Sequence, residues 1–188
     1  ILQVVDKFLI GKQLGLAETG IYSFLFSMAS VLGVFVISGF YIIYLPQLIE
    51  SFKNNKSSFK KVFLKFSLLT FGSSLVMAIL IIFISPYVFL LIEKDIMLEH
   101  MNLLYLLLFG FVLHNISLIP HVFLYVCHDE KRISLIMGGA FVVNLTLNLI
   151  LITDLGINGA AYSFVATYLA ILLFKSLRAI IKWRKLAV

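Results

Sequence analysis

The chain of 188 residues is 62% hydrophobic and 13% charged, and its mean hydropathy is +1.09. A water-soluble chain of this length cannot bury so much apolar surface, so the composition excludes an ordinary soluble domain. The formal net charge of +6 does not indicate a nucleic-acid-binding protein. The basic residues cluster between the apolar runs and form no basic stripe interleaved with aromatic residues.

The lengths of the apolar runs distinguish between two kinds of membrane protein. Several runs reach the ~20 residues that a helix needs to cross ~30 Å of hydrocarbon, whereas a β-barrel would show short segments of alternating polarity. The sequence therefore predicts an all-α, polytopic transmembrane helix bundle without a separate soluble domain. The single cysteine, Cys127, excludes an internal disulfide and a multi-cysteine metal site, and no metal or cofactor is expected.

The first predicted element is residues 1–10, "ILQVVDKFLI", which we expect to be the end of a truncated preceding helix. The chain opens there inside an apolar stretch, without a start methionine or a signal-peptide pattern. Five membrane-spanning helices are predicted after it, at residues 20–46, 62–84, 101–126, 133–152 and 160–181. The polar, lysine-rich link after Pro46 is predicted to be partly an amphipathic helix on the membrane surface, anchored through Leu48, Ile49, Phe52 and Phe59.

The distribution of basic residues predicts the orientation in the membrane, because Lys and Arg are retained on the cytoplasmic side. If the link at residues 53–65 and the C-terminus are cytoplasmic, only three of the 15 Lys and Arg residues lie on the other side, namely Lys7, Lys12 and Lys94. Five crossings then place the turns at residues 14–20 and 155–159 outside. The C-terminus is expected to be cytoplasmic.

One phrase occurs twice, as "LGLAETGIYSF" from Leu14 and as "LGINGAAYSF" from Leu155. The first glycine of each copy is expected to form a tight turn, and the second to let the new helix touch its neighbour closely. The tyrosines are predicted in the interfacial aromatic belt. Two explanations account for the repeated phrase. One is an internal duplication, and the other is that these residues are common at membrane hairpins. The residues with these structural roles are Gly15, Gly20, Tyr22, Gly156, Gly159 and Tyr162.

Two longer stretches resemble one transporter family. "DKFLIGKQLGLAETGIYSFLFSMAS", from Asp6, looks like the segment leading into the second helix of the C-terminal half of bacterial O-antigen or capsule polysaccharide flippases (Wzx-type). "NLTLNLILITDLGINGAAYSFVATYL", from Asn144, is similar to their closing helix pair, with Asn144, Asn148, Gly156, Gly159, Ala160, Ala161 and Thr167 at matching places. The resemblance covers essentially the whole chain.

The resemblance implies a lobe of a two-lobe transporter from the superfamily that contains the multidrug and toxin extrusion (MATE) transporters and the lipid II flippases. Such a protein moves undecaprenyl-diphosphate-linked oligosaccharide across the cytoplasmic membrane by alternating access, with no enzymatic step. The implied partners are lipid-linked oligosaccharide, membrane lipid, an N-terminal lobe of the same protein and a coupling cation, H⁺ or Na⁺. No nucleic-acid partner is expected.

Polar residues within the apolar runs are the candidates for a substrate path, because they are costly in lipid. They could equally hydrogen-bond between helices and stiffen the bundle. Lys65, Lys175 and Arg178 are expected to snorkel to the cytoplasmic ends, and no acidic cation site is expected within the membrane. Any charge that binds the diphosphate is therefore expected in the other lobe or at the cytoplasmic mouth. The path candidates are His114, Asn115, His121, Asn144 and Asn148.

Other readings remain open. A MATE-type drug or cation antiporter and a lipid II flippase belong to the same class, and an acidic intramembrane site would favour the antiporter. A membrane-embedded polysaccharide polymerase or glycosyltransferase would need a sizeable polar loop, whereas the external links "EKDIMLEH" and "TDLGING" are short. An inactive truncated product is a further possibility. The sequence carries no phosphate-cradling Gly-Lys-Ser/Thr loop and no HExxH motif.

Overall fold

The computed structural model describes residues 2–54 and 56–186, and these residues form helices joined by short turns, without a β-strand. The predicted all-α class is therefore confirmed. In chain order the elements are α1 (Leu2–Gln13), α2 (Leu16–Val36), the π-helical turn η1 (Ile37–Tyr41), α3 (Ile42–Asn54), α4 (Lys56–Leu91), α5 (Ile96–Glu99), α6 (Met101–Val126), α7 (Glu130–Leu155) and α8 (Ile157–Leu186).

Five helices of the described part are long and apolar enough to cross a membrane. The first is continuous from Leu16 to Asn54 through α2, η1 and α3, and the others are α4, α6, α7 and α8. Each predicted span lies inside one of these helices. Four of the five helices extend past the predicted span at both ends, because the polar residues that flank the apolar core are also helical. The chain is thus a multi-pass membrane protein in its architecture.

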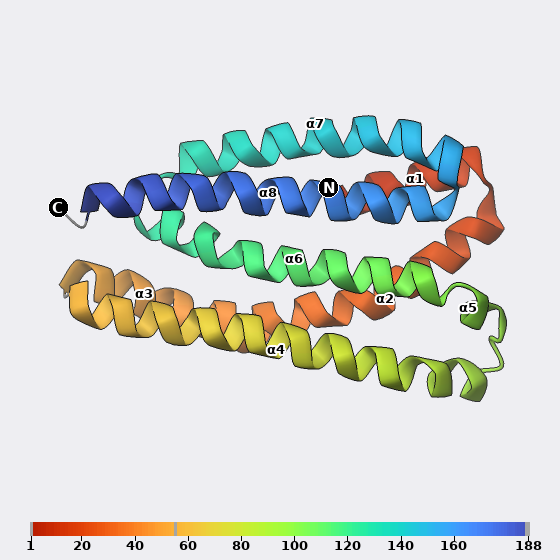
Figure 1. The fold of residues 1–188 in the computed structure, drawn as a ribbon, viewed down its shortest axis with the longest axis horizontal. Helices are drawn as coiled ribbons and strands as arrows, with labels where there is room; N and C mark the ends of the chain where they lie inside the picture. Colours follow the sequence, from red (N-terminus) through yellow and green to blue (C-terminus); the bar gives the residue numbers. More distant parts are fainter. Residues whose placement is uncertain (1, 55, 187–188) are drawn as a thin grey trace.

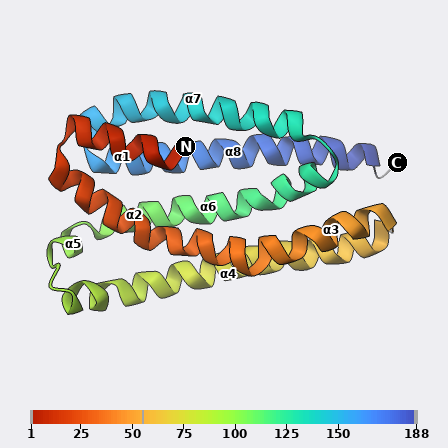
Figure 2. The same cartoon turned by 180° about the vertical axis from the view of Figure 1, so that it is seen from behind.

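Helix α6 is the centre of the bundle. In its most apolar 18-residue window 61% of the residues are buried, against 22–28% in the other spans. It packs against α8 on one side and against α2 and α4 on the other, while α7 covers α8 from outside (Figures 1 and 2). Helices α6 and α8 run in the same direction, because α7 returns the chain between them.

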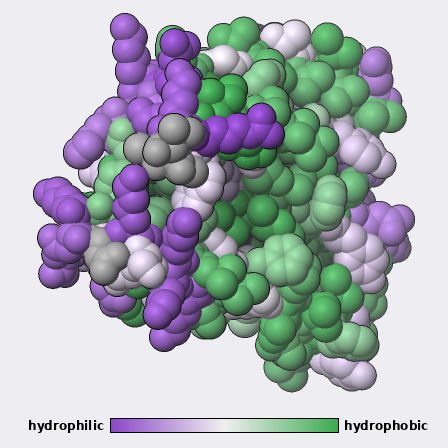
Figure 3. Space-filling view, turned by 60° about the vertical axis from the view of Figure 1, so that its left-hand side comes forward, coloured by the Kyte–Doolittle hydropathy of each residue, from purple (hydrophilic) through white to green (hydrophobic). Residues whose placement is uncertain are grey.

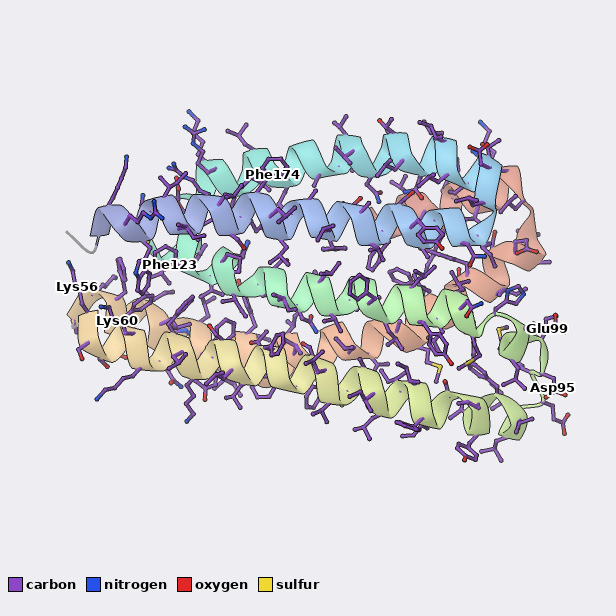
Figure 4. The ribbon with its side chains drawn as sticks, in the orientation of Figure 1. Lys56, Lys60, Asp95, Glu99, Phe123 and Phe174 are labelled. Carbon is purple, nitrogen blue, oxygen red and sulfur yellow. The ribbon has the colours of Figure 1, made fainter. Side chains whose placement is uncertain are left out.

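Charged residues gather at the two ends of the bundle. The α3–α4 junction, the α6–α7 turn and the C-terminal end of α8 lie at one end, and α5 and the α7–α8 turn lie at the other (Figure 1). Figure 4 places Lys56 and Lys60 at the first end and Asp95 and Glu99 at the opposite end. In Figure 3 hydrophilic side chains crowd the end that carries the C-terminus, next to a broad apolar flank. We call the first end the basic end.

The sides of the bundle expose large apolar side chains of a kind that soluble proteins bury. Leu16, Phe83 and Leu91 are 87%, 70% and 84% exposed, and Phe174 is 60% exposed. These residues come from α2, α4 and α8, so the exposed apolar surface is not confined to one helix. A lipid environment is the physical reason for this surface, since lipid tails solvate it without penalty.

The link after Pro46 is helical, but two of its predicted membrane anchors, Leu48 and Phe59, pack against protein, so their predicted role as anchors is wrong. Leu48 is fully buried and Phe59 is 3% exposed, in a second core at the basic end. Helix α3 continues the line of α2 through η1, and the chain then folds back as α4, so the apolar faces of the two helices meet each other. Phe59 contacts Phe52, with ring centroids 5.1 Å apart, and Trp183 of α8, at 6.4 Å.

The repeated phrase folds as two different turns. Gly15 and Gly156 have φ angles of 93° and 62°, which glycine adopts without strain, as predicted. A Cβ atom on Gly159 would lie 1.9 Å from the carbonyl oxygen of Leu151, so α8 starts in direct contact with α7. Gly20, in contrast, has no neighbour within 4 Å of such a Cβ atom, and the close contact predicted there is wrong.

The two tyrosines of the repeat also differ in their surroundings. Tyr162 is 46% exposed on the bundle surface, where an interfacial side chain belongs. Tyr22 is fully buried and donates a hydrogen bond to Asp6, so its predicted place in the aromatic belt is wrong. Burial of the hydroxyl requires a polar partner, and α1 supplies it.

An ion pair connects the α6–α7 turn to α8 at the basic end. The guanidinium of Arg178 donates to both carboxylate oxygens of Asp129, from Nε at 2.7 Å and from Nη2 at 3.3 Å. The hydrogen bonds from Arg178 lower the pKa of the Asp129 carboxyl below its ordinary value. The stabilisation is therefore complete above the ordinary pKa of aspartate and is lost as the pH falls through the lower folded-state pKa.

We expect Arg178→Gln to lower the melting temperature of the detergent-solubilised protein by a few degrees at pH 7. The difference from wild type should shrink below pH ~4, where Asp129 becomes protonated in the unfolded chain and then in the folded chain. Thermal melts between pH 3 and pH 8 measure it, with Arg184→Gln as the control at an exposed arginine of the same helix. A difference that is independent of pH would contradict the ion pair.

Candidate functional site

A cluster of buried polar side chains joins α1, α2, α7 and α8. The carboxylate of Asp6 accepts a hydrogen bond from Asn148 Nδ2 at 2.7 Å and one from the Tyr22 hydroxyl at 3.3 Å. Asn144 Nδ2 donates to Thr167 Oγ1 at 3.2 Å. We call this cluster the acidic site, and none of its members is more than 1% exposed. Its members are Asp6, Tyr22, Asn144, Asn148 and Thr167.

The acidic site contains a carboxylate that is fully buried in the helix bundle, which the sequence did not predict. Asn148 lies seven residues before the end of α7, which places it ~10 Å inside the bundle. Among the described residues no basic side chain forms a salt bridge with Asp6. Its neighbour Lys7 instead lies over the ring of Phe26, with Nζ 5.2 Å from the centroid.

In the acidic site some oxygen acceptors have no donor among the described residues. The side-chain oxygens of Asn144 and Asn148 are both buried and have no hydrogen-bond partner among the described residues. Asn148 uses its amide nitrogen on Asp6 and on the Asn144 carbonyl oxygen, at 2.7 and 3.0 Å. Unpaired buried acceptors beside a carboxylate are costly unless a cation or a proton binds to them. Carboxylate, amide and hydroxyl oxygens are also the ligands that hard cations prefer.

Asn115 lies in a different part of the bundle, where it connects three helices. Its Nδ2 donates to Ser74 Oγ of α4 at 3.1 Å and to the Leu32 carbonyl oxygen of α2 at 3.4 Å. The side chain is fully buried. These contacts are interhelical hydrogen bonds. They match the second role considered for the polar residues, which was to stiffen the bundle rather than to line a substrate path.

We expect Asn115→Ala to lower the free energy of unfolding by about 1–2 kcal/mol, because two interhelical hydrogen bonds are lost and a small cavity remains. Thermal melts of the protein in detergent measure this change. Asn102→Ala on the exposed face of the same helix is the matched control and should leave the melting temperature unchanged. If both variants melt alike, Asn115 does not hold the three helices together.

His114 and His121 face α8 from α6, away from the acidic site. The His114 ring packs edge-on against Tyr168, with centroids 4.9 Å apart. The Nδ1 atoms of both histidines are buried without a hydrogen-bond partner among the described residues. Lys175 of α8 is 4% exposed, so the expectation that it snorkels to the surface is wrong. Its ammonium lies within electrostatic range of both imidazoles.

Two grooves open on the sides of the bundle, and neither is lined by the predicted path residues. One, of about 420 Å³, lies between α7 and α8 and includes Phe174 and Arg178. The other, of about 430 Å³, lies between α4, α6 and α8 and includes Phe123 and Arg184. Figure 4 shows Phe123 and Phe174 on different sides of α8. Both grooves are mainly apolar, as is the surface around them.

The structure thus divides the five predicted path residues among three places. Asn144 and Asn148 belong to the acidic site, Asn115 connects α6 to α2 and α4, and the two histidines face Lys175. The sequence reading missed Asp6, Thr167 and Lys175 as site residues. Asp6 and Thr167 lie within the two stretches that resemble flippases. The sequence showed their places in those stretches, but it could not show that their side chains are buried.

Comparisons with known proteins gave no match: no family model, no curated protein and no solved structure is significantly similar to this chain.

Proposed function

We propose that this chain is a lobe of a cation-coupled flippase that moves undecaprenyl-diphosphate-linked oligosaccharide across the cytoplasmic membrane. The resemblance of the stretches from Asp6 and from Asn144 to polysaccharide flippases suggests the substrate class. The apolar bundle with polar groups buried inside it supports a transporter, because intramembrane polar groups mark ion and substrate paths. The basic end is cytoplasmic in this proposal, which follows the positive-inside rule.

The acidic site is the observation that carries the proposal. A buried carboxylate that forms no salt bridge among the described residues, in a site where two amide oxygens also lack a partner there, is an arrangement that stability alone does not favour. It suits a coupling cation, held by Asp6 and the side-chain oxygens of Asn144 and Asn148, with the Thr167 hydroxyl beside them. The site brings a carboxylate, two amide side chains and a hydroxyl together, whereas a proton needs the carboxylate alone, so we favour Na⁺ over H⁺.

The cation would couple to transport because the acidic site connects four helices. Binding pulls the oxygens of α1 and α7 together, and release leaves their charges and dipoles unbalanced. The site therefore has two arrangements whose relative energies depend on the ion, which is what alternating access requires. The transport cycle in this proposal breaks no covalent bond. The other lobe, membrane lipid and the lipid-linked oligosaccharide are its proposed partners.

A MATE-type drug antiporter is the second candidate, and one observation favours it. An acidic residue buried within the membrane is the feature expected of a cation-driven drug exporter, and Asp6 supplies it. The two candidates differ in substrate and share the proposed coupling site.

Complementation separates these candidates. The protein containing this chain should restore surface polysaccharide in cells that lack their own flippase, and Asp6→Asn should reduce the restored amount about tenfold or more. Asp154→Asn, at an exposed acid of α7, is the control and should restore fully. Resistance to cationic drugs without restored polysaccharide would favour the antiporter. If wild type gives neither effect, the flippase proposal is wrong.

A further inference from the structure

The groove between α4, α6 and α8 ends in charged residues at the basic end. Its volume is about 430 Å³, and its walls are mainly apolar side chains, such as Phe63 of α4, Ile119 of α6 and Ile180 of α8. Trp183 and Arg184, close to the end of α8, line it as well. We call it the Trp183 groove. An apolar groove with a cation at one end matches an amphiphilic molecule whose charged group is an anion.

The Trp183 groove runs from the basic end toward the middle of the bundle. Its lining residues on α8 extend from Ser176 to Arg184, a distance of eight residues or ~12 Å along the helix. One leaflet of the hydrocarbon core is ~15 Å thick, half of the ~30 Å of the whole core. The groove therefore follows most of the depth of one leaflet. Ile180 is 50% exposed, so the side of the groove is open to lipid.

Aromatic rings of α4 and α6 hold Trp183 in place. Its ring centroid lies 5.2 Å from that of Phe123 and 6.3 Å from that of Phe63. The Nζ atom of Lys60 lies 6.0 Å from the Trp183 ring, and Figure 4 shows Lys60 and Phe123 toward the same end of the bundle. Tryptophan prefers the headgroup level of a bilayer, because its ring is apolar and its N–H is polar. The charges of Lys60 and Arg184 thus belong at headgroup level too.

These two cations have no carboxylate partner among residues 2–54 and 56–186. Neither Arg184 nor Lys60 forms a salt bridge in that part of the chain, and no acidic side chain of it lines the groove. The groove of similar size between α7 and α8 differs, because its Arg178 is already paired with Asp129. A phosphate accepts hydrogen bonds from a guanidinium and attracts a nearby ammonium. A lipid phosphate therefore suits the Trp183 groove better than the groove beside α7.

We propose that the Trp183 groove is a binding site for one anionic phospholipid. The phosphate pairs with Arg184 and Lys60, and an acyl chain lies along the apolar walls toward Ser176. A zwitterionic phospholipid fits less well, because its headgroup brings a cation of its own to two basic side chains. The bound phospholipid is distinct from a transported substrate, so this site stands or falls independently of the proposed flippase function.

Fluorescence of Trp183 tests the site, because this residue is the single tryptophan of the chain. The protein containing this chain is placed in phosphatidylcholine nanodiscs, with any tryptophan outside the chain replaced by phenylalanine. Phosphatidylglycerol or phosphatidylcholine with brominated acyl chains then replaces part of the lipid, since bromine quenches an indole that it contacts. We expect phosphatidylglycerol to occupy the groove with about tenfold or more preference over phosphatidylcholine.

Two results for the wild-type protein would overturn the proposal. Equal quenching by the two brominated lipids would mean that the groove does not select an anionic headgroup. No quenching by either lipid would mean that another part of the protein or a second copy covers the groove.

Substitutions assign the preference to the end of the groove. Arg184→Gln should lower it about fivefold, because one basic side chain near the headgroups contributes about that factor, and Arg184→Lys should keep it within about twofold. Lys185→Gln is the matched control, since it removes the same charge from the next residue of α8, which does not line the groove. Both positions are exposed, so the fold tolerates these changes.

The control should keep the preference within about twofold of wild type. An unchanged preference in Arg184→Gln would overturn the proposal. An equal fall in Arg184→Gln and Lys185→Gln would assign the effect to the general positive charge of the basic end and would also overturn it.

Discussion

Na⁺ should raise the melting temperature of the wild-type protein and leave that of Asp6→Asn unchanged. A ligand that binds only the folded protein stabilises it by about 2.7 kcal/mol at 100 times its dissociation constant. For a chain of this size, that corresponds to a rise of roughly 5–10 °C. The asparagine variant keeps the shape of the side chain but loses its charge, and one of its two acceptor oxygens becomes an amide donor. The cation then has no carboxylate to compensate the loss of its water shell.

The measurement is a thermal melt in detergent at constant ionic strength, with choline replacing Na⁺. Asp154→Asn is the control, because it removes a carboxylate from the exposed outer end of α7. That variant should show the full Na⁺-dependent rise. If Asp6→Asn responds to Na⁺ as wild type does, the acidic site does not hold the ion. If wild type itself does not respond, Na⁺ is not the coupling ion.

Gly159→Ala should destabilise the bundle strongly. The added Cβ atom would lie 1.9 Å from the Leu151 carbonyl oxygen and 2.8 Å from the Ile152 backbone nitrogen. These are backbone atoms of α7, so no side-chain rotation relieves the overlap, and α8 has to move away from α7. We expect a loss of about 3 kcal/mol, the upper end for overpacking, and a fall in the melting temperature of roughly 6–12 °C.

Gly20→Ala is the matched control, because Gly20 is the counterpart of Gly159 in the repeated phrase. No atom lies within 4 Å of the position of its Cβ atom, and alanine favours a helix over glycine by about 1 kcal/mol. The melting temperature of this variant should stay the same or rise by a few degrees. Equal destabilisation by both substitutions would show that the two copies of the phrase pack alike, contrary to the structure.

The helical architecture was predictable from the sequence because long apolar runs leave few alternatives in lipid. Backbone groups in hydrocarbon must bond within their own segment, so a run such as residues 101–126 becomes a helix whatever its neighbours are. The turns at Gly15 and Gly156 were predictable for a similar local reason, since glycine tolerates the positive φ that each turn has.

The burial of single polar residues was not predictable, because it depends on which helix faces which. Lys175 lies close enough to the end of an apolar run to reach water if it faces lipid. It is buried instead because it lies on the side of α8 that packs on α6. Asp6 is similar: a carboxylate near the start of the chain reads as a solvated residue until α7 brings Asn148 to it from 142 positions away.

The second core at the basic end was also not predictable from the sequence, although its residues are apolar. Leu48 and Phe59 have the spacing of a surface-lying amphipathic helix, and the sequence contains no sign that α3 and α4 fold against each other there. The pairing depends on Phe123 and Trp183, which come from α6 and α8 and close this core. The sequence pattern correctly predicted which residues form the apolar face. It wrongly predicted that Leu48 and Phe59 contact lipid, because both pack against other helices.

The parallel pairing of α6 and α8 has a consequence for biogenesis. During synthesis α6 enters the bilayer before α7 and α8 have left the ribosome, so the helix with the most buried surface waits without its main partner. A chain that stops before residue 157 would present the α8-facing side of α6, including His114 and His121, to lipid.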